Sequence, residues 1–219
     1  MKTFFPGFLI FVMLLAGCQK IPAGLVTTVS GTVMDNNRGV PIMNAKIIIQ
    51  EEKYKFTGEA PPETSTGNPI TAISGPDGKY AVTFTTNGAG DEYLIGLSLD
   101  NNYLNNNSFQ KIAVGRSDTI NFNAWQLATL KAHIIVKNNP APPIWAIGVN
   151  ASSAKIYGTN NDTIVNLLVV PNQQNGLQFG IQVPGNQYGS YFLQNITLTG
   201  FSDTYYQTFT VYPSTFIQL

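Results

Sequence analysis

Apolar and polar residues alternate along most of this chain, in short runs that are typical of β-strands. From residue 27 to residue 122 the pattern predicts about seven strands, including one in which Tyr93, Ile95 and Leu97 share a face. Clusters of Gly, Asn, Asp and Pro separate the runs, as expected for turns. Asp77-Gly78 is the clearest of them, because Gly readily adopts left-handed backbone. The pattern predicts an all-β unit.

The alternation resumes after residue 124 and predicts about six further strands. Residues 128–136 alternate cleanly, whereas residues 164–170 are nearly all apolar and predict a central strand buried on both faces. The fold class predicted is therefore all-β, with two tandem antiparallel β-sandwich domains. We expect the first at residues 27–123 and the second at residues 124–219, with no clear sequence repeat between them.

The stretch from residue 51 to residue 70 departs from the alternating pattern. Residues 51–56 hold most of the local charge, and residues 60–69 are rich in Pro, Thr and Gly. Such a composition predicts an exposed loop. Long loops on rigid scaffolds often carry binding residues. Two interpretations therefore stay open, a solvated insertion and a functional loop.

The N-terminal 17 residues follow a different pattern. Lys2 precedes a short apolar run at residues 4–16, and spanning a bilayer takes about 20 apolar residues. The run instead predicts a secretory signal peptide. It ends in small residues before Cys18, which is the only cysteine of the chain. The order Leu15-Ala16-Gly17-Cys18 resembles the bacterial lipobox.

The lipobox resemblance implies cleavage before Cys18 and acylation of its thiol and of the new N-terminus. Several acyl chains hold a protein firmly on a membrane, at about 0.8 kcal/mol per buried methylene. We therefore expect an outer-membrane lipoprotein, on the periplasmic or the cell-surface face, with residues 18–26 as a short tether. The alternative is an ordinary signal peptide with a free cysteine.

Four short motifs of the first domain resemble the carboxypeptidase regulatory-like family. They are Ser30-Gly31-Thr32-Val33, Gly39-Val40-Pro41-Ile42, Asn44-Ala45-Lys46-Ile47 and Asp77-Gly78-Lys79-Tyr80. The resemblance implies a prealbumin-like (transthyretin-like) sandwich of the accessory kind, not a catalytic domain, as found in surface lipoproteins and outer-membrane transporters of Bacteroidota-type bacteria. For the second domain we expect an immunoglobulin-like or a prealbumin-like sandwich.

Composition excludes several classes of function. The 12 basic and 12 acidic residues balance, which argues against a nucleic-acid partner. His133 is the only histidine, so a two-histidine zinc site is excluded, and no G-x-S-x-G motif supplies a nucleophilic serine. Acylation of Cys18 would leave no thiol for catalysis or zinc. The acidic residues show neither paired carboxylates nor a calcium-loop spacing. We expect no enzyme activity, metal or cofactor.

Aromatic residues are the remaining candidates for ligand contacts, because exposed rings can stack on sugars. The candidates are Trp125, Trp145, Tyr157, Tyr188 and Tyr191. The alternative is that these rings belong to the core or its rim. Thr119 and Thr163 each lie in an Asp-Thr-apolar sequence that resembles the O-glycosylation acceptor of exported Bacteroidota proteins. Ordinary strand preference explains the same threonines.

The function expected from these features is that of a non-catalytic binding or assembly module at the cell envelope. Its partner would be an outer-membrane protein complex or a glycan, in addition to the membrane itself. Two alternatives stay open, a fimbrillin-like pilus or adhesion subunit and a small carbohydrate-binding lipoprotein. Maturation of a pilin would need cleavage at Lys20 or Arg38, and Arg38 lies in a predicted turn, which argues against the pilus.

Overall fold

The computed structural model describes residues 20–54, 63–105, 107–182 and 189–218. Every regular element in these ranges is a β-strand, apart from the short 3-10 helix η3 (Pro213–Thr215). The predicted all-β class is confirmed. No helix in these ranges is long and apolar enough to cross a membrane. The predicted signal peptide and Cys18 lie outside the described residues.

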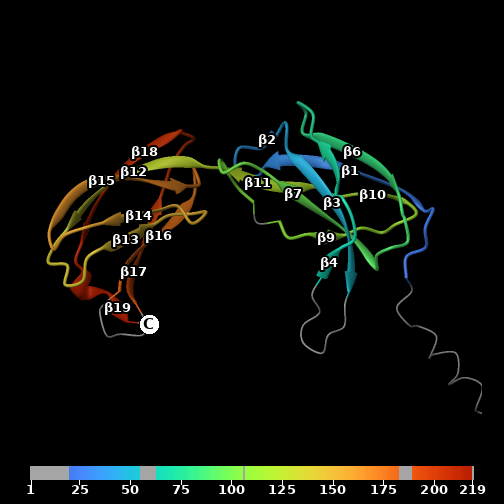
Figure 1. Cartoon of the computed structure of the whole chain (residues 1–219). Coiled ribbons are helices and arrows are strands. Elements are labelled where there is room, and N and C mark those ends of the chain that lie inside the picture. Colours follow the sequence, from blue (N-terminus) through green and yellow to red (C-terminus); the bar gives the residue numbers. More distant parts are fainter. Residues whose placement is uncertain (1–19, 55–62, 106, 183–188, 219) are drawn as a thin grey trace, which may run out of the picture. The chain divides into compact units, whose positions relative to one another are not determined.

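Two compact units make up the chain (Figure 1). The first unit contains residues up to 33, residues 43–98 and residues 107–122. The second contains residues 34–42, 99–106 and 123–219. Two short segments that were expected within the first domain thus cluster with the second unit.

The strands between residues 26 and 126 form two sheets. Their bounds are β1 (Val26–Asp35), β2 (Val40–Pro41), β3 (Lys46–Tyr54), β4 (Glu63–Ser65), β5 (Ile70–Ile73), β6 (Lys79–Thr85), β7 (Glu92–Ser98), β8 (Tyr103–Leu104), β9 (Gln110–Lys111), β10 (Ser117–Thr119) and β11 (Phe122–Gln126). One sheet has the order β10-β1-β11-β8, and β2 and β6 also pair with β1. The other has the order β4-β3-β7-β9, and β5 also pairs with β3.

The predicted alternation produces the core of the first unit. Val29, Ile47 and Ile95 are fully buried on the inward faces of β1, β3 and β7. The packing is close enough at one point that only Gly fits. A Cβ atom at Gly31 would lie 1.8 Å from the carbonyl oxygen of Ile120. This steric constraint explains why the Ser30–Val33 motif contains Gly at position 31.

The start of the predicted insertion is not solvated, which corrects the expectation of a solvated loop. β3 continues to Tyr54 and pairs with β4, and Glu51 and Glu52 are both buried. Charge predicts exposure only where the fold offers no partners for the charged group. Those partners come from distant parts of the chain, so the sequence pattern could not reveal them. Residues 55–62 lie outside the described ranges.

The carboxylate of Glu51 accepts three hydrogen bonds from other segments. Oε1 accepts from the Gly90 N–H at 2.9 Å and from the Tyr93 hydroxyl at 2.8 Å, and Oε2 accepts from the Thr66 hydroxyl at 2.6 Å. Burial raises the pKa of Glu51, but the hydrogen bonds together outweigh this effect and hold the pKa below its usual value. Glu51 therefore ties β3 to β7 as an ionised group.

The second unit is a sandwich of a three-stranded and a five-stranded sheet. Its strands are β12 (Ala128–Val136), β13 (Ile144–Ile147), β14 (Ser153–Ile156), β15 (Asn161–Val169), β16 (Gln174–Ile181), β17 (Ser190–Thr197), β18 (Thr204–Val211) and β19 (Ile217–Gln218). The sheet orders are β15-β12-β18 and β14-β13-β16-β17-β19.

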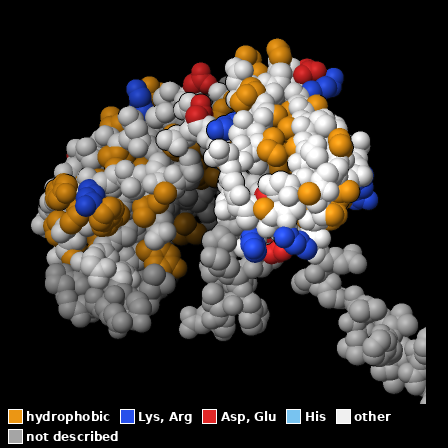
Figure 2. Space-filling view, turned by 45° about the vertical axis from the view of Figure 1, so that its right-hand side comes forward, with side chains coloured by type: hydrophobic (Ala, Val, Ile, Leu, Met, Phe, Trp, Pro, Cys, Tyr) orange, Lys and Arg blue, Asp and Glu red, His pale blue; other side chains and the backbone are white. Residues whose placement is uncertain are grey.

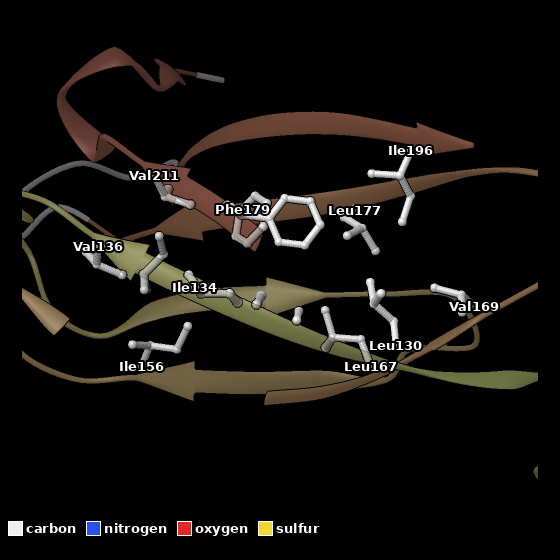
Figure 3. Packing of buried hydrophobic residues seen from close by; sticks show 14 of the residues in the cluster. Leu130, Ile134, Val136, Ile156, Leu167, Val169, Leu177, Phe179, Ile196 and Val211 are labelled. Carbon is white, nitrogen blue, oxygen red and sulfur yellow. The ribbon is translucent and has the colours of Figure 1, made fainter. Parts of the chain in front are cut away.

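Buried side chains from both sheets meet between them and form the core of this unit (Figure 3). Leu130 and Ile134 of β12 are fully buried. Leu177 of β16 is fully buried too, and Phe179 of the same strand is 1% exposed. Buried and half-buried residues alternate without interruption along β12, as the sequence predicts. β12 is the central strand of its sheet, so it can bury one face along its whole length.

The prediction for residues 164–170 is wrong. Residues 164–169 belong to β15, which pairs only with β12 and so forms an edge of the sheet. Ile164 is 64% exposed, while Leu167 and Val169 are buried. An apolar run predicts burial on both faces only if a second layer covers the outer face. In the described part of this unit the other sheet covers β15 on one face alone.

The two units share one strand order, although no sequence repeat is apparent. The first strand of each, β1 or β12, lies between an antiparallel strand, β6 or β15, and a parallel strand, β10 or β18. The second sheet runs β5-β3-β7-β9 in the first unit and β14-β13-β16-β17 in the second, with each neighbouring pair antiparallel. The same order is compatible with many sequences, because it requires only an inward apolar face on each strand.

Candidate ligand-binding site

A row of four residues crosses the five-stranded sheet of the second unit. The register places Lys155 of β14 opposite Trp145 of β13, Trp145 opposite Gly180 of β16, and Gly180 opposite Tyr191 of β17. Residues directly opposite one another in antiparallel strands point to the same face. The four residues therefore lie side by side on one surface.

This surface is the outer face of the sandwich. Ile144 and Phe179, each one position away from the row, are buried in the core. Alternate residues of a strand point to opposite faces, so the row points away from the core. Trp145 and Tyr191 are half-buried, which leaves part of each ring accessible, and Gly180 between them is half-buried as well.

Gly180 leaves a hollow between the two aromatic side chains. Neighbouring strands lie about 4.8 Å apart, so the backbones that carry Trp145 and Tyr191 are separated by about 10 Å. A pocket of about 170 Å³ is found here. Gln178 and Gln182, two positions to either side of Gly180, line it as well. We call this site the Trp145–Tyr191 pocket.

The positively charged side chain of Lys155 packs against the Trp145 ring of the pocket. The Lys155 ammonium lies 4.2 Å from the centroid of the Trp145 ring, within the range of a cation–π contact. Lys155 comes from β14, on the side of Trp145 away from Gly180. The contact holds the indole in place without filling the hollow, and the described lining residues carry no charge.

The composition of the pocket suits a small, uncharged ring that bears hydroxyl groups. Aromatic faces pack against apolar ring surfaces. The amides of Gln178 and Gln182 each offer donors and an acceptor. Typical pockets for drug-sized ligands measure about 300–1,000 Å³, so a pocket of about 170 Å³ accommodates only a single ring.

The structure brings together two of the five predicted aromatic residues, Trp145 and Tyr191. Trp125 lies in β11 opposite Leu104, and Tyr157 follows β14 with 63% of its surface exposed, and neither lines the pocket. Tyr188 lies outside the described residues. Sequence analysis missed both glutamines, because nothing in the sequence shows which strands are neighbours.

Both predicted glycosylation sites lie on strands. Thr119 is exposed at the end of β10, and its N–H is 2.9 Å from the Asp118 carboxylate. Thr163 is half-buried on β15, opposite Ile134. Modification of either threonine stays a prediction.

A second polar cluster lies on the outer face of the three-stranded sheet. His133 Nε2 is 2.5 Å from the Asp162 carboxylate, and His133 Nδ1 is 3.5 Å from the Thr208 hydroxyl. Thr208, His133 and Asp162 follow the order of the nucleophile, the base and the carboxylate in a catalytic triad. The Asp162 side chain is 69% exposed, however, and the His133 side chain is 37% exposed, so the cluster is open to solvent. We interpret it as polar pairing on the surface.

Charged side chains are sparse on the surface. On the face that Figure 2 shows, Lys, Arg, Asp and Glu occur in small, separate groups among uncharged atoms. Within the ranges that the structure describes, no group of three His, Cys, Asp or Glu side chains is placed to hold a metal ion. The Trp145–Tyr191 pocket is thus the candidate site with the clearest ligand chemistry.

No protein-family model and no curated protein matches this chain. Solved structures resemble it in fold. The minor pilin GBS52 of Streptococcus agalactiae has 10% identity and a TM-score of 0.42, over 85% of this chain and 96% of that one. The shaft pilin SpaA of Lactobacillus rhamnosus GG has 8% identity and a TM-score of 0.30, over 88% and 98%.

A DUF3823 family protein from Parabacteroides merdae is similar at the same level. It has 12% identity and a TM-score of 0.31, over 80% of this chain and 100% of that one. The identities and TM-scores are too low to assign a family or a function. The function of this protein is therefore argued from its own residues.

Proposed function

We propose that this protein is a non-catalytic, glycan-binding lipoprotein of the cell envelope, and that the Trp145–Tyr191 pocket binds one neutral sugar residue. The observation that supports this most strongly is the cross-strand row in which Gly180 separates two aromatic rings. The glutamines at either end of the pocket supply hydrogen-bonding groups where sugar hydroxyls would lie.

The proposed binding is weak for a single sugar. Each ring contact contributes about 0.5–1.5 kcal/mol beyond the area that it buries. With two rings and a few solvent-exposed hydrogen bonds we expect a binding free energy near 4 kcal/mol, or a Kd on the order of 1 mM. Useful retention on a glycan would then come from many anchored copies acting together.

Membrane attachment forms part of the proposal. The lipobox at Leu15–Cys18 would anchor the chain. The expected tether of residues 18–26 is shorter in the structure, because Pro22, Gly24 and Leu25 hydrogen-bond to Thr86 and β1 begins at Val26. A chain anchored in this way would meet glycans of the cell envelope. A role as an accessory subunit of an outer-membrane complex is compatible with this site, and so is a role in adhesion.

The test is titration of the full chain with a panel of neutral and acidic oligosaccharides, followed by changes in tryptophan fluorescence and in protein NMR spectra. The decisive variant is Gly180→Val, which fills the hollow. A Cβ at Gly180 meets only the Ser190 carbonyl oxygen, at 3.7 Å, and Val favours strands, so the variant should fold.

We expect Gly180→Val and Trp145→Ala each to weaken binding of a neutral oligosaccharide at least about 10-fold, which corresponds to about 1.4 kcal/mol. Tyr157→Ala is the matched control, because it removes an exposed aromatic residue outside the pocket. Equal binding by Gly180→Val and the unaltered chain would refute the site. Binding of acidic sugars alone would refute the proposed ligand class.

A further inference from the structure

The outer edge of β18 lacks the features that normally protect a sheet edge. β18 pairs only with β12, and its eight residues, Thr204–Val211, include no charge, Pro or Gly. Natural edge strands are usually short, or contain charged residues or Pro, and these features prevent them from pairing with strands of other chains. Most other strands at sheet ends in the described ranges have such protection; the exceptions are β5, which has only four residues, and the part of β17 beyond its pairing with β19. β9, β10 and β19 are two or three residues long, and charged residues lie in β6 (Lys79), β14 (Lys155) and β15 (Asp162).

Three residues in the middle of β18 direct their backbone polar groups outward. In a parallel pair, every second residue points both its N–H and its C=O at the neighbouring strand. The Lys137 N–H donates to the Val211 C=O, so the odd-numbered residues of β18 face β12. Tyr206, Thr208 and Thr210 consequently point their groups to the open side, where no strand of the described chain pairs with them.

The sandwich is also open beside this edge. A groove of about 360 Å³ lies between β17 and β18, and Phe192, Gln194 and Gln207 line it. These three residues lie on the faces that turn toward the other sheet, yet Phe192 is 38% exposed. Phe209, at 7% exposure, forms part of the groove as well. A strand added to β18 would lie over these residues.

We propose that β18 pairs antiparallel with β18 of a second copy of this chain, which joins two three-stranded sheets into one of six strands. Pairing centred on Thr208 sets Thr208 opposite Thr208, and Tyr206 opposite Thr210. The three outward residues of each strand then form six backbone hydrogen bonds, and none of their N–H or C=O groups is left over. The contact is two-fold symmetric, so it closes as a dimer.

A second copy fits this edge better than a charged segment of another protein. Like charges placed directly opposite each other destabilise a sheet, and two β18 strands bring none together. The register also keeps the faces matched. Gln207 of each copy lies opposite Phe209 of the other on the inner face, while Phe209 stays packed in its own core. On the outer face, Tyr206 and Thr210 form a cross-strand pair of the kind that stabilises sheets.

Cysteine cross-linking in the full chain tests both the dimer and its register. In a hydrogen-bonded antiparallel pair the opposed Cα atoms are about 5.5 Å apart, within the range of about 4.4–6.8 Å for disulfides. Thr208→Cys should therefore give a disulfide-linked dimer under mild oxidation. Tyr206→Cys and Thr210→Cys should not cross-link singly, because like residues are then about 13 Å apart, but should do so when co-expressed. The unaltered chain, which has only Cys18, is the control.

Charge reversal provides an independent measurement. Thr208→Glu and Thr208→Lys should each lower dimerisation of the full chain in detergent at least about 10-fold, and an equimolar mixture of the two should restore it. Asn166→Glu, on the opposite edge strand of the same sheet, is the matched control and should leave the dimer intact. Three results would overturn the proposal. They are a monomeric Thr208→Cys chain, equal cross-linking at all three positions, and disulfides formed only with a different protein.

Discussion

The hydrogen bond between Tyr93 and Glu51 offers the sharpest test of how the first unit is held together. Tyr93 is 3% exposed, and its hydroxyl donates to Glu51 Oε1 at 2.8 Å. Burial, together with the hydrogen bond to Glu51, raises the pKa of Tyr93 to about 12, so its hydroxyl stays protonated at neutral pH. The substitution Tyr93→Phe removes this bond and the longer one that the hydroxyl accepts from the Asn87 N–H at 3.3 Å, and it leaves the ring in place against Phe84, 5.0 Å away between centroids.

The size of the effect should depend on pH. A hydrogen bond to a charged group contributes about 1.5–3 kcal/mol and a neutral one about 0.5–1.5 kcal/mol. The pKa of Glu51 is lowered on folding from its ordinary value of 4.5. Its charge therefore stabilises the fold above that value and ceases to do so as pH falls through the lower folded pKa. We expect Tyr93→Phe to lose about 2 kcal/mol near pH 7, and we expect this loss to fall toward about 1 kcal/mol as pH drops through the folded pKa of Glu51.

Native-state hydrogen exchange of peptides covering β3 and β7 is the appropriate measurement, because it reports local opening free energies. Tryptophan fluorescence would not serve, since Trp125 and Trp145 both belong to the second unit. Tyr80→Phe is the control. The Tyr80 hydroxyl donates to the uncharged Ile120 carbonyl at 2.6 Å, so its loss should be about 1 kcal/mol and should not change as pH is lowered. A loss for Tyr93→Phe near pH 7 that does not exceed the loss for Tyr80→Phe would refute the view that Glu51 is ionised.

Three further predictions, one of them with a control substitution, follow from the packing and the hydrogen bonds. Gly31→Ala should lower stability by more than about 3 kcal/mol, seen as a large drop in Tm, because its Cβ would meet the Ile120 carbonyl at 1.8 Å. Leu130→Ala should lose about 3 kcal/mol in urea unfolding of the second unit, whereas Ile164→Ala, 64% exposed, should lose less than about 0.5 kcal/mol. Asp35→Ala should lose about 2 kcal/mol by hydrogen exchange in the 35–39 turn, because its buried carboxylate accepts two backbone N–H groups there.

Several features of the fold could be read from the sequence, because they depend on neighbouring residues only. The alternation along residues 128–136 fixes which face of β12 is buried, whatever strand pairs with it. The turns at residues 35–39 and 75–79 follow from residues that tolerate left-handed backbone, and Gly39 and Gly78 both have positive φ angles. Half of the proposed site was predicted as well, since Trp145 and Tyr191 were candidates by residue type.

Features that depend on which strands are neighbours were decided by the tertiary structure. Ile164 lies in an apolar run, yet it is exposed because β15 is an edge strand. Glu51 lies in a charged run, yet it is buried because Gly90 and Tyr93 bring donors to it. Neither outcome can be read from the local pattern, since burial depends on what covers a strand and not only on the strand itself.

The proposed pocket shows the same division between sequence and structure. The types of its residues are present in the sequence, but Trp145, Gly180 and Tyr191 are 35 and 11 positions apart and become neighbours only through the register of three strands. A register shift of one residue would turn every side chain of a strand to its other face. The sequence determined the strands and their buried faces, because these follow from local alternation. Tertiary structure decided the order and register of the strands, because these depend on long-range pairing energies, and with them which side chains form a site.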